Sequence, residues 1–140
     1  AMAMSAIAGG GELLKPQILA RKNVSPQVVR RVIPAGVAAS VRSLLVSAVE
    51  GDLATGKKAK VADVRVGGKT GTALIPDPKR GGYDPDRMVS SFIGFLPADS
   101  PRMVISVVIH EPNPHIAHFG GDVAAPAFAK IAGLAVKLVK

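Results

Sequence analysis

The residues with the clearest chemical potential lie in one short run, Lys69-Thr70-Gly71-Thr72. If the run is extended, successive side chains alternate between two faces, so Thr70 and Thr72 lie on one face and Lys69 on the other. Gly71 weakens a strand and is typical of a place where another group approaches the backbone closely. Two hydroxyls and an ammonium beside bare backbone suit an anionic group, such as a carboxylate laid along the strand.

A Lys-Thr pair also ends the phosphate-binding loop of nucleotide hydrolases, so the spacing before it matters. That loop requires a glycine five positions before the glycine that precedes the lysine. Here Gly68 precedes Lys69, and the position five before Gly68 is Asp63. The pattern is broken, and a carboxylate at that position would repel phosphate. The spacing argues against a nucleotide site and leaves an anion-binding strand or a chance surface strand.

The composition narrows the class of protein. The 140 residues, 48% of them hydrophobic, suffice for one domain with a core. Lys and Arg outnumber Asp and Glu by 18 to 10, but these basic residues are scattered and only 4% of the chain is aromatic. A platform for stacking bases is poorly supplied, so nucleic acid is not expected as a partner. The absence of cysteine excludes disulfides and thiolate sites.

The surrounding sequence predicts the sheet that must hold the lysine run. Two runs rich in β-branched residues, 88–96 and 103–109, are joined by a Pro-containing turn and predict an antiparallel hairpin. The lysine strand, approached through Val61, Val64 and Val66, is expected in the same sheet. Loops are expected over 76–86 and 111–121.

Three segments predict helices, over 1–8, 35–50 and 124–139. The middle helix is expected to bury Val37, Val41, Leu44, Leu45 and Ala48. The closing helix is expected to pack on the sheet through Phe128, Ile131, Leu134, Ala135 and Leu138. An extended piece over 13–19, a polar turn over 21–23 and a strand over 28–33 complete the chain. The fold class is α/β of the α+β type: an antiparallel sheet with packed helices, in one domain over 1–140.

The chain resembles the C-terminal part of the transpeptidase domain of penicillin-binding proteins, of the class B type that acts in cell division. The matching pieces are IAGGGELLKP (7–16), TGKKA (55–59), VGGKTGTA (66–73), GGY (81–83), SFIGFLP (91–97), EP (111–112) and GGDVAAPAF (120–128). Each piece is short, and their common order and spacing carry the resemblance, which covers nearly the whole chain. It implies the C-terminal part of a penicillin-binding/β-lactamase-like transpeptidase fold.

The resemblance implies serine acyl transfer on the D-Ala-D-Ala end of peptidoglycan stem peptides, which β-lactams imitate. Three motifs carry that chemistry: Ser-x-x-Lys, Ser-x-Asn and Lys-[Ser/Thr]-Gly. Only the third is present, because none of the nine serines has a lysine three positions on or an Asn or Asp two positions on. Without a nucleophile beside a base, the chain alone is expected to be inactive. Because residues 1–8 read as the body of a helix, we expect a fragment whose partner is the missing N-terminal part of the domain.

The resemblance also implies roles for individual residues. Lys69 supplies positive charge near the substrate carboxylate, and the hydroxyls of Thr70 and Thr72 bind that carboxylate. The backbone N–H of Thr72 forms half of the oxyanion hole, so Lys69 and Thr72 are the implied catalytic residues. The implied substrate-binding set is Lys69, Thr70, Gly71, Thr72, Ala73 and Tyr83. No cofactor and no metal are implied.

The chain departs from the family pattern at several positions. Leu74 stands where many relatives carry Gln, Ala54 replaces the first glycine of a Gly-Thr-Gly, and His118-Phe119 stands where two aromatic residues precede the double glycine. His115 and His118 have a ligand-like spacing, but without a cysteine or a fourth ligand a polar loop is favoured over a zinc site.

Two further features keep alternatives open. Tyr83 either lines the substrate cleft or packs on the sheet. The basic run Lys57, Lys58 and Lys60 either meets an anionic glycan or forms a solvated face.

Three functions remain in competition. The first is part of a D,D-transpeptidase, the second a non-catalytic module that binds cell-wall or division partners, and the third a related carboxypeptidase or β-lactamase. The pieces SFIGF and GGDVAAP favour the first over the third. The expected location is outside the cytoplasm, with the parent held by an N-terminal membrane segment.

Overall fold

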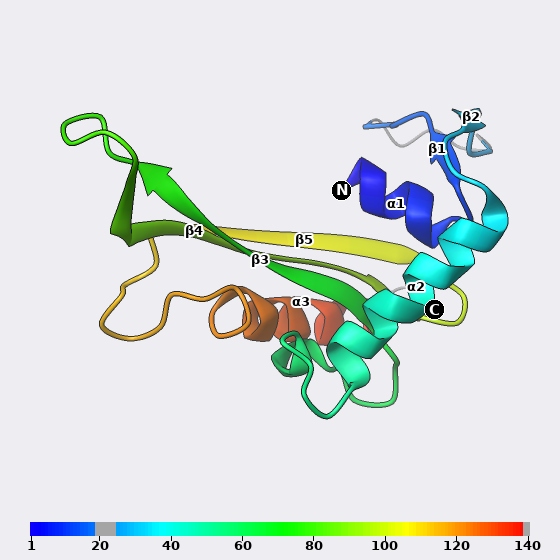
Figure 1. The fold of residues 1–140 in the computed structure, drawn as a ribbon. Helices are drawn as coiled ribbons and strands as arrows, with labels where there is room; N and C mark the ends of the chain where they lie inside the picture. The colour runs from blue at the N-terminus through cyan, green and yellow to red at the C-terminus, as the bar shows by residue number, and fades with distance from the viewer. Residues whose placement is uncertain (19–24, 139–140) are drawn as a thin grey trace.

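A three-stranded antiparallel sheet dominates the computed structural model, which describes residues 1–18 and 25–138 (Figure 1). The strands are β3 (Gly67–Pro76), β4 (Tyr83–Leu96) and β5 (Met103–His110), in the order β3-β4-β5. Lys69 lies opposite Ile93, and Leu96 lies opposite Met103. The predicted hairpin and the placement of the lysine strand beside it are confirmed.

The β3–β4 hairpin is longer than the sequence predicted, because β4 begins at Tyr83, inside the expected loop 76–86. After an irregularity between Leu74 and Ile75, pairing resumes and joins Pro76 to Tyr83. The chain reverses at Gly81 and Gly82, whose φ angles of 75° and 77° favour glycine. The hairpin therefore extends well beyond the rest of the sheet (Figure 1).

The helices are α1 (Met2–Ala8), α2 (Ala35–Glu50) and α3 (Ala124–Leu138), with a short 3-10 helix, η1 (Lys57–Ala59). They cover both faces of the sheet, because side chains of β4 alternate between the faces. Phe95 packs with Ala8 on the side of α1. Phe92 packs on Phe128 of α3 with ring centroids 4.7 Å apart and planes at 61°. Figure 1 shows α1 and α3 on opposite sides of the sheet. This agrees with the predicted fold class.

Helix α2 bridges the two apolar clusters. Leu45 joins the cluster around α1, and Val49 joins the cluster around Phe92. A second, small antiparallel sheet of β1 (Glu12–Leu14) and β2 (Val28–Arg31) lies near the N-terminus. The predicted turn at 21–23, and the ends of the pieces predicted over 13–19 and 124–139, fall outside the described residues.

The buried faces of two helices differ from the expected ones. In α3, Ala125, Phe128 and Ala132 are buried, whereas Ile131, Leu134 and Leu138 are 48%, 65% and 85% exposed. Almost every position of α3 is apolar, so hydropathy could not show which face of the helix is buried. The two small alanines beside Phe128 allow the helix to approach the sheet closely. The expectation that Leu134 is buried is wrong.

Helix α2 shows the same kind of correction. Its fully buried residues are Ala38 and Val49, while Val37 and Leu44, expected on the buried stripe, are 50% and 69% exposed. Before β3, the expected extended approach is instead a tight turn in which Val61 bridges to Val64 and Asp63 has a φ of 61°.

Truncating the buried Phe128 of α3 should lower the stability of the fold far more than truncating the exposed Leu134. We expect Phe128→Ala to lower the free energy of unfolding by about 3–5 kcal/mol, because it leaves a cavity against Phe92. Leu134→Ala is the matched control on the same helix and should change it by less than about 0.5 kcal/mol. Urea unfolding of both variants measures the difference; equal losses would contradict the assigned helix face.

An ion pair connects β4 to the residue that follows β5. The Nε of Arg87 on β4 donates to Oε1 of Glu111, just after β5, at 3.1 Å, and a second nitrogen of the same guanidinium donates to the same oxygen. The hydrogen bond from Arg87, followed by its positive charge, lowers the pKa of Glu111 below its usual range. The same contact raises the pKa of Arg87.

This pair should make stability depend on pH in the acid range. Because the pKa of Glu111 is lower in the folded state, its contribution is present above the ordinary value of 4.5 and is lost as the pH falls through the folded-state value. Wild type should therefore exceed Glu111→Gln in melting temperature at pH 7 and converge with it in strong acid. Arg87→Gln should remove the same pH dependence. A constant difference between wild type and Glu111→Gln at all pH values would rule out this linkage.

Candidate active site

The Lys69-Thr70-Gly71-Thr72 run lies on an edge of the main sheet. Among the described residues, β3 has a strand neighbour, β4, on one side only, so every second backbone N–H and C=O of β3 points away from the sheet. Lys69 and Thr72 are exposed and Thr70 is half-buried. Side chains and free backbone groups thus meet along one accessible line.

The expected alternation of faces is observed. Thr70 and Thr72 lie opposite Phe92 and Ser90, on the side of α3. Lys69 lies opposite Ile93, which packs in the cluster of α1. Directly opposite residues of an antiparallel pair share a face, so the two hydroxyls and the lysine leave the strand on different sides.

The ammonium of Lys69 nevertheless returns to the strand edge. Its Nζ donates to the backbone oxygen of Thr70 at 2.9 Å and to Thr70 Oγ1 at 3.4 Å. The hydroxyl of Thr70 in turn donates to Oγ1 of Thr55 at 3.4 Å. One cation and two hydroxyls therefore gather beside the edge strand, an arrangement that suits a carboxylate.

The loop before α3 is fixed against the same strand. The N–H of Gly120 donates to Oγ1 of Thr72 at 3.1 Å. A Cβ at Gly120 would lie 2.5 Å from the backbone oxygens of both Gly71 and Ser91. A Cβ at Gly121 would lie 2.5 Å from the backbone oxygen of Thr55. Only glycines let the loop approach the two strands this closely.

A carboxylate at the end of α2 fixes the start of β3. Oε1 of Glu50 accepts from the N–H of Val66 at 3.1 Å, and its other oxygen lies 3.4 Å from Nζ of Lys60. The sequence alone assigned no role to Glu50. Its position at the end of a helix, shortly before the lysine strand, was the available signal for this structural role.

Not all of the predicted substrate-binding residues come together. Ala73 is exposed and follows Thr72 directly on β3. Tyr83 is 67% exposed and pairs with Pro76, about 20 Å along the strand from Lys69. Leu74 is 44% exposed. Any contact of Tyr83 with a ligand held at Lys69 stays a prediction.

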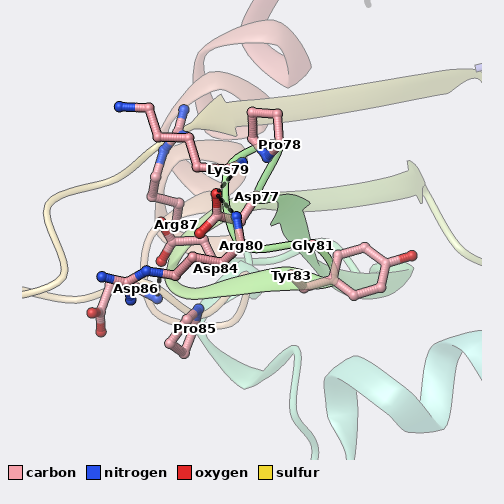
Figure 2. A pocket seen from close by; sticks show the side chains of 10 residues that line it. All are labelled: Asp77, Pro78, Lys79, Arg80, Gly81, Tyr83, Asp84, Pro85, Asp86 and Arg87. Atoms are coloured by element: carbon pink, nitrogen blue, oxygen red, sulfur yellow. Dashed lines mark hydrogen bonds between the residues drawn. The ribbon is translucent and has the colours of Figure 1, made fainter.

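An open pocket of about 570 Å³ lies at the far end of the hairpin, remote from Lys69. Figure 2 shows its charged side chains, with the ring of Tyr83 directed away from them. Asp77 accepts from the backbone N–H groups of Lys79 and Arg80 at 2.9 and 3.2 Å, which shapes the turn itself. The pocket is therefore a feature of the turn and does not include the lysine run.

His118 and Lys58, from the histidine and lysine groups noted in the sequence, lie in different surroundings. Nδ1 of His118 is buried with no hydrogen-bond partner among the described residues, and its ring packs edge-to-face on Phe119. Lys58 pairs with Asp122 at 2.8 Å. Within residues 1–18 and 25–138, no three His, Cys, Asp or Glu side chains are grouped to hold a metal ion.

Over the same residues, no helix has the length and hydropathy needed to cross a bilayer.

The chain matches a known protein family. The family model described as "Penicillin binding protein transpeptidase domain" matches residues 1–133. The transpeptidase domain of penicillin-binding protein 3 from Burkholderia pseudomallei, solved in its apo form, superposes with a TM-score of 0.87 at 37% identity, over 99% of this chain and 41% of that one.

Curated relatives agree. Probable peptidoglycan D,D-transpeptidase PenA of Neisseria gonorrhoeae is 40% identical over 133 residues, which is 95% of this chain and 22% of the relative. Stage V sporulation protein D of Bacillus subtilis is 41% identical, over 92% of this chain and 21% of the relative. The chain thus spans about a fifth of the length of these relatives. The resemblance inferred from the motifs is confirmed, and the chain belongs to the penicillin-binding protein transpeptidase domain family.

Proposed function

We propose that this chain supplies the Lys-Thr-Gly strand and the carboxylate-binding edge of a peptidoglycan D,D-transpeptidase. The observation that carries the proposal is the accessible edge of β3, where Lys69 Nζ, Thr70 Oγ1 and Thr55 Oγ1 follow one another at 3.4 Å. Lys69 Nζ also donates to the backbone oxygen of Thr70 at 2.9 Å. The names of the relatives, which include probable D,D-transpeptidases, support the same reaction class.

In this proposal the strand binds the terminal carboxylate of a D-Ala-D-Ala stem peptide, or the carboxylate of a β-lactam. Lys69 supplies the positive charge, and the hydroxyls of Thr70 and Thr72 donate hydrogen bonds, with Thr70 turning its proton from Thr55 Oγ1 to the ligand. The backbone N–H of Thr72 stabilises the oxyanion that forms when the carbonyl is attacked. Gly71 and Ala73 present bare or nearly bare backbone to the ligand.

The nucleophile must come from another segment. No serine of the chain precedes a lysine by three positions. Acyl transfer requires a nucleophile within reach of a base, so the chain acts together with a serine-bearing part of the transpeptidase domain. In this reading residues 1–140 are the C-terminal portion of that domain, and Lys69 faces the missing serine.

The relatives suggest the setting. Among them is probable peptidoglycan D,D-transpeptidase FtsI of Caulobacter vibrioides, 34% identical to this chain. We extend this to septal cell-wall synthesis outside the cytoplasm, with an anchored parent protein and division proteins as further partners. Fluorescent-fusion localisation to the division site, lost on removal of an N-terminal anchor, tests this assignment.

One alternative has an observation in its favour. The lack of a Ser-x-x-Lys motif in these 140 residues also fits a non-catalytic module that binds stem peptides. A serine-bearing segment that restores acylation when combined with this chain discriminates the two. Binding of a stem peptide without any acylation, whatever segment is added, would favour the module.

The isolated chain should form no covalent adduct with a penicillin. None of its serines has a lysine positioned to accept its proton. Incubation with labelled benzylpenicillin, followed by intact-mass spectrometry, measures this directly. The complete transpeptidase domain is the positive control. An acylated species of the isolated chain would overturn the assignment of the nucleophile to another segment.

In the complete domain, Lys69→Ala should reduce the acylation rate by about 10²–10³-fold, the magnitude expected for loss of a preorganised electrostatic contact. Thr72→Ala should cost less, because alanine retains the backbone N–H proposed for the oxyanion hole. Stopped-flow acylation by a reporter β-lactam gives both rates. A larger loss for Thr72→Ala than for Lys69→Ala would contradict these roles.

A further inference from the structure

Ser90 is the one polar residue that is fully buried in the described part of the chain. A buried hydroxyl is costly unless it is hydrogen-bonded, and an apolar residue would fill a core strand position equally well. The Oγ of Ser90 donates to the backbone oxygen of His118, in the loop before α3. The contact joins residues 28 positions apart, so it fixes a loop rather than a local turn.

The position of Ser90 connects this bond to the lysine strand. Ser90 lies directly opposite Thr72, on the same face of the sheet. Thr72 Oγ1 accepts from the N–H of Gly120 at 3.1 Å. One cross-strand pair therefore holds both sides of Phe119, through the carbonyl of His118 and the amide of Gly120.

The loop has little freedom at this point. Gly120 lies against the backbones of Gly71 and Ser91 so closely that a Cβ would meet their oxygens at 2.5 Å. Residues 118–120 lie on the β3–β4 pair, and the hydroxyl of Ser90 is the β4 side chain that bonds this part of the loop. Loss of that bond would let the Gly120 amide shift relative to Thr72.

A shift of the Gly120 amide matters because it changes the hydrogen bonding of the Thr72 hydroxyl. A threonine hydroxyl has one proton and two acceptor lone pairs. When Gly120 donates to one lone pair, the proton of Thr72 is left to donate to another acceptor at the exposed strand edge. A ligand carboxylate is such an acceptor, so the Gly120 contact sets the direction of the Thr72 proton.

We propose that Ser90 is a positioning residue for carboxylate recognition, acting through the His118–Gly120 loop on the hydroxyl of Thr72. This inference rests on the proposed function of the lysine strand. The proposal gives Ser90 a role in ligand binding in addition to its place in the core.

The test is a double-mutant cycle in the complete transpeptidase domain. Ser90→Ala should lower the second-order acylation constant for benzylpenicillin by about 3–10-fold, the effect of one modest hydrogen bond. In a Thr72→Val background, which lacks the hydroxyl, the same Ser90→Ala change should alter the constant less than about 2-fold. Equal losses in both backgrounds, or no loss in either, would refute the proposal.

A second readout separates positioning from general weakening. The methyl ester of benzylpenicillin has no carboxylate, so Ser90→Ala should reduce its acylation less than that of the free acid. Ser106→Ala, at an exposed position on β5, is the matched control and should leave both constants unchanged. Equal losses with acid and ester would assign Ser90 a purely structural role and overturn the inference.

Two further outcomes are decisive. If Ser90→Ala lowers the melting temperature too far for assay, Ser90→Cys fills a similar volume with a weaker donor and should show an intermediate loss with the same dependence on Thr72. Absence of that dependence refutes the inference. If the wild-type domain is not acylated at all, the proposed function itself fails. If the domain is acylated but the effects of the Ser90 and Thr72 changes simply add, only the inference about Ser90 fails.

Discussion

The packing of two phenylalanine rings of β4 over two glycines of β3 is the constraint on which the rest of the structure depends. A Cβ at Gly67 would lie 2.3 Å from the ring of Phe95, and one at Gly68 would lie 2.5 Å from the ring of Phe92. One phenylalanine therefore fills the space above a glycine on each face of the sheet, and both rings are fully buried. Lys69 follows these glycines directly, so the Lys-Thr-Gly-Thr run begins where ring packing holds the strand.

Polar contacts hold the parts of the chain on both sides of these two glycines. Glu50 fixes the backbone before the glycines, while Thr55 and Gly120 contact the two threonine hydroxyls. These contacts come from a helix end, a turn and a loop, which are separate segments of the chain. Side chains held in this way need little reorganisation to meet a charged ligand, which is an advantage of a strand over a free loop as the support of a binding site.

The sequence predicted the sheet well because strand periodicity is local. The alternation that separates Lys69 from Thr70 follows from extended backbone alone, and the turn at 97–102 joins two runs of β-branched residues. The helix faces could not be predicted, because α3 is apolar nearly all round and Leu134 and Phe128 have equal claims by hydropathy. The Gly120–Thr72 contact spans 48 positions and has no periodic signal. Ser90 looks like an ordinary strand residue until its loop partner is known.

The order of the strands has a consequence for how the chain folds. β3, β4 and β5 are consecutive in sequence and adjacent in the sheet, so each pairing closes a short connection. Pairings of this kind form rapidly, because little chain entropy is lost before native contacts accumulate. The loop at 118–121 docks across a longer separation, so we expect it to complete the edge afterwards. Weakening that loop should therefore accelerate unfolding of the β3 edge while leaving the folding rate nearly unchanged, so the lifetime of the folded edge depends on the contacts that form last.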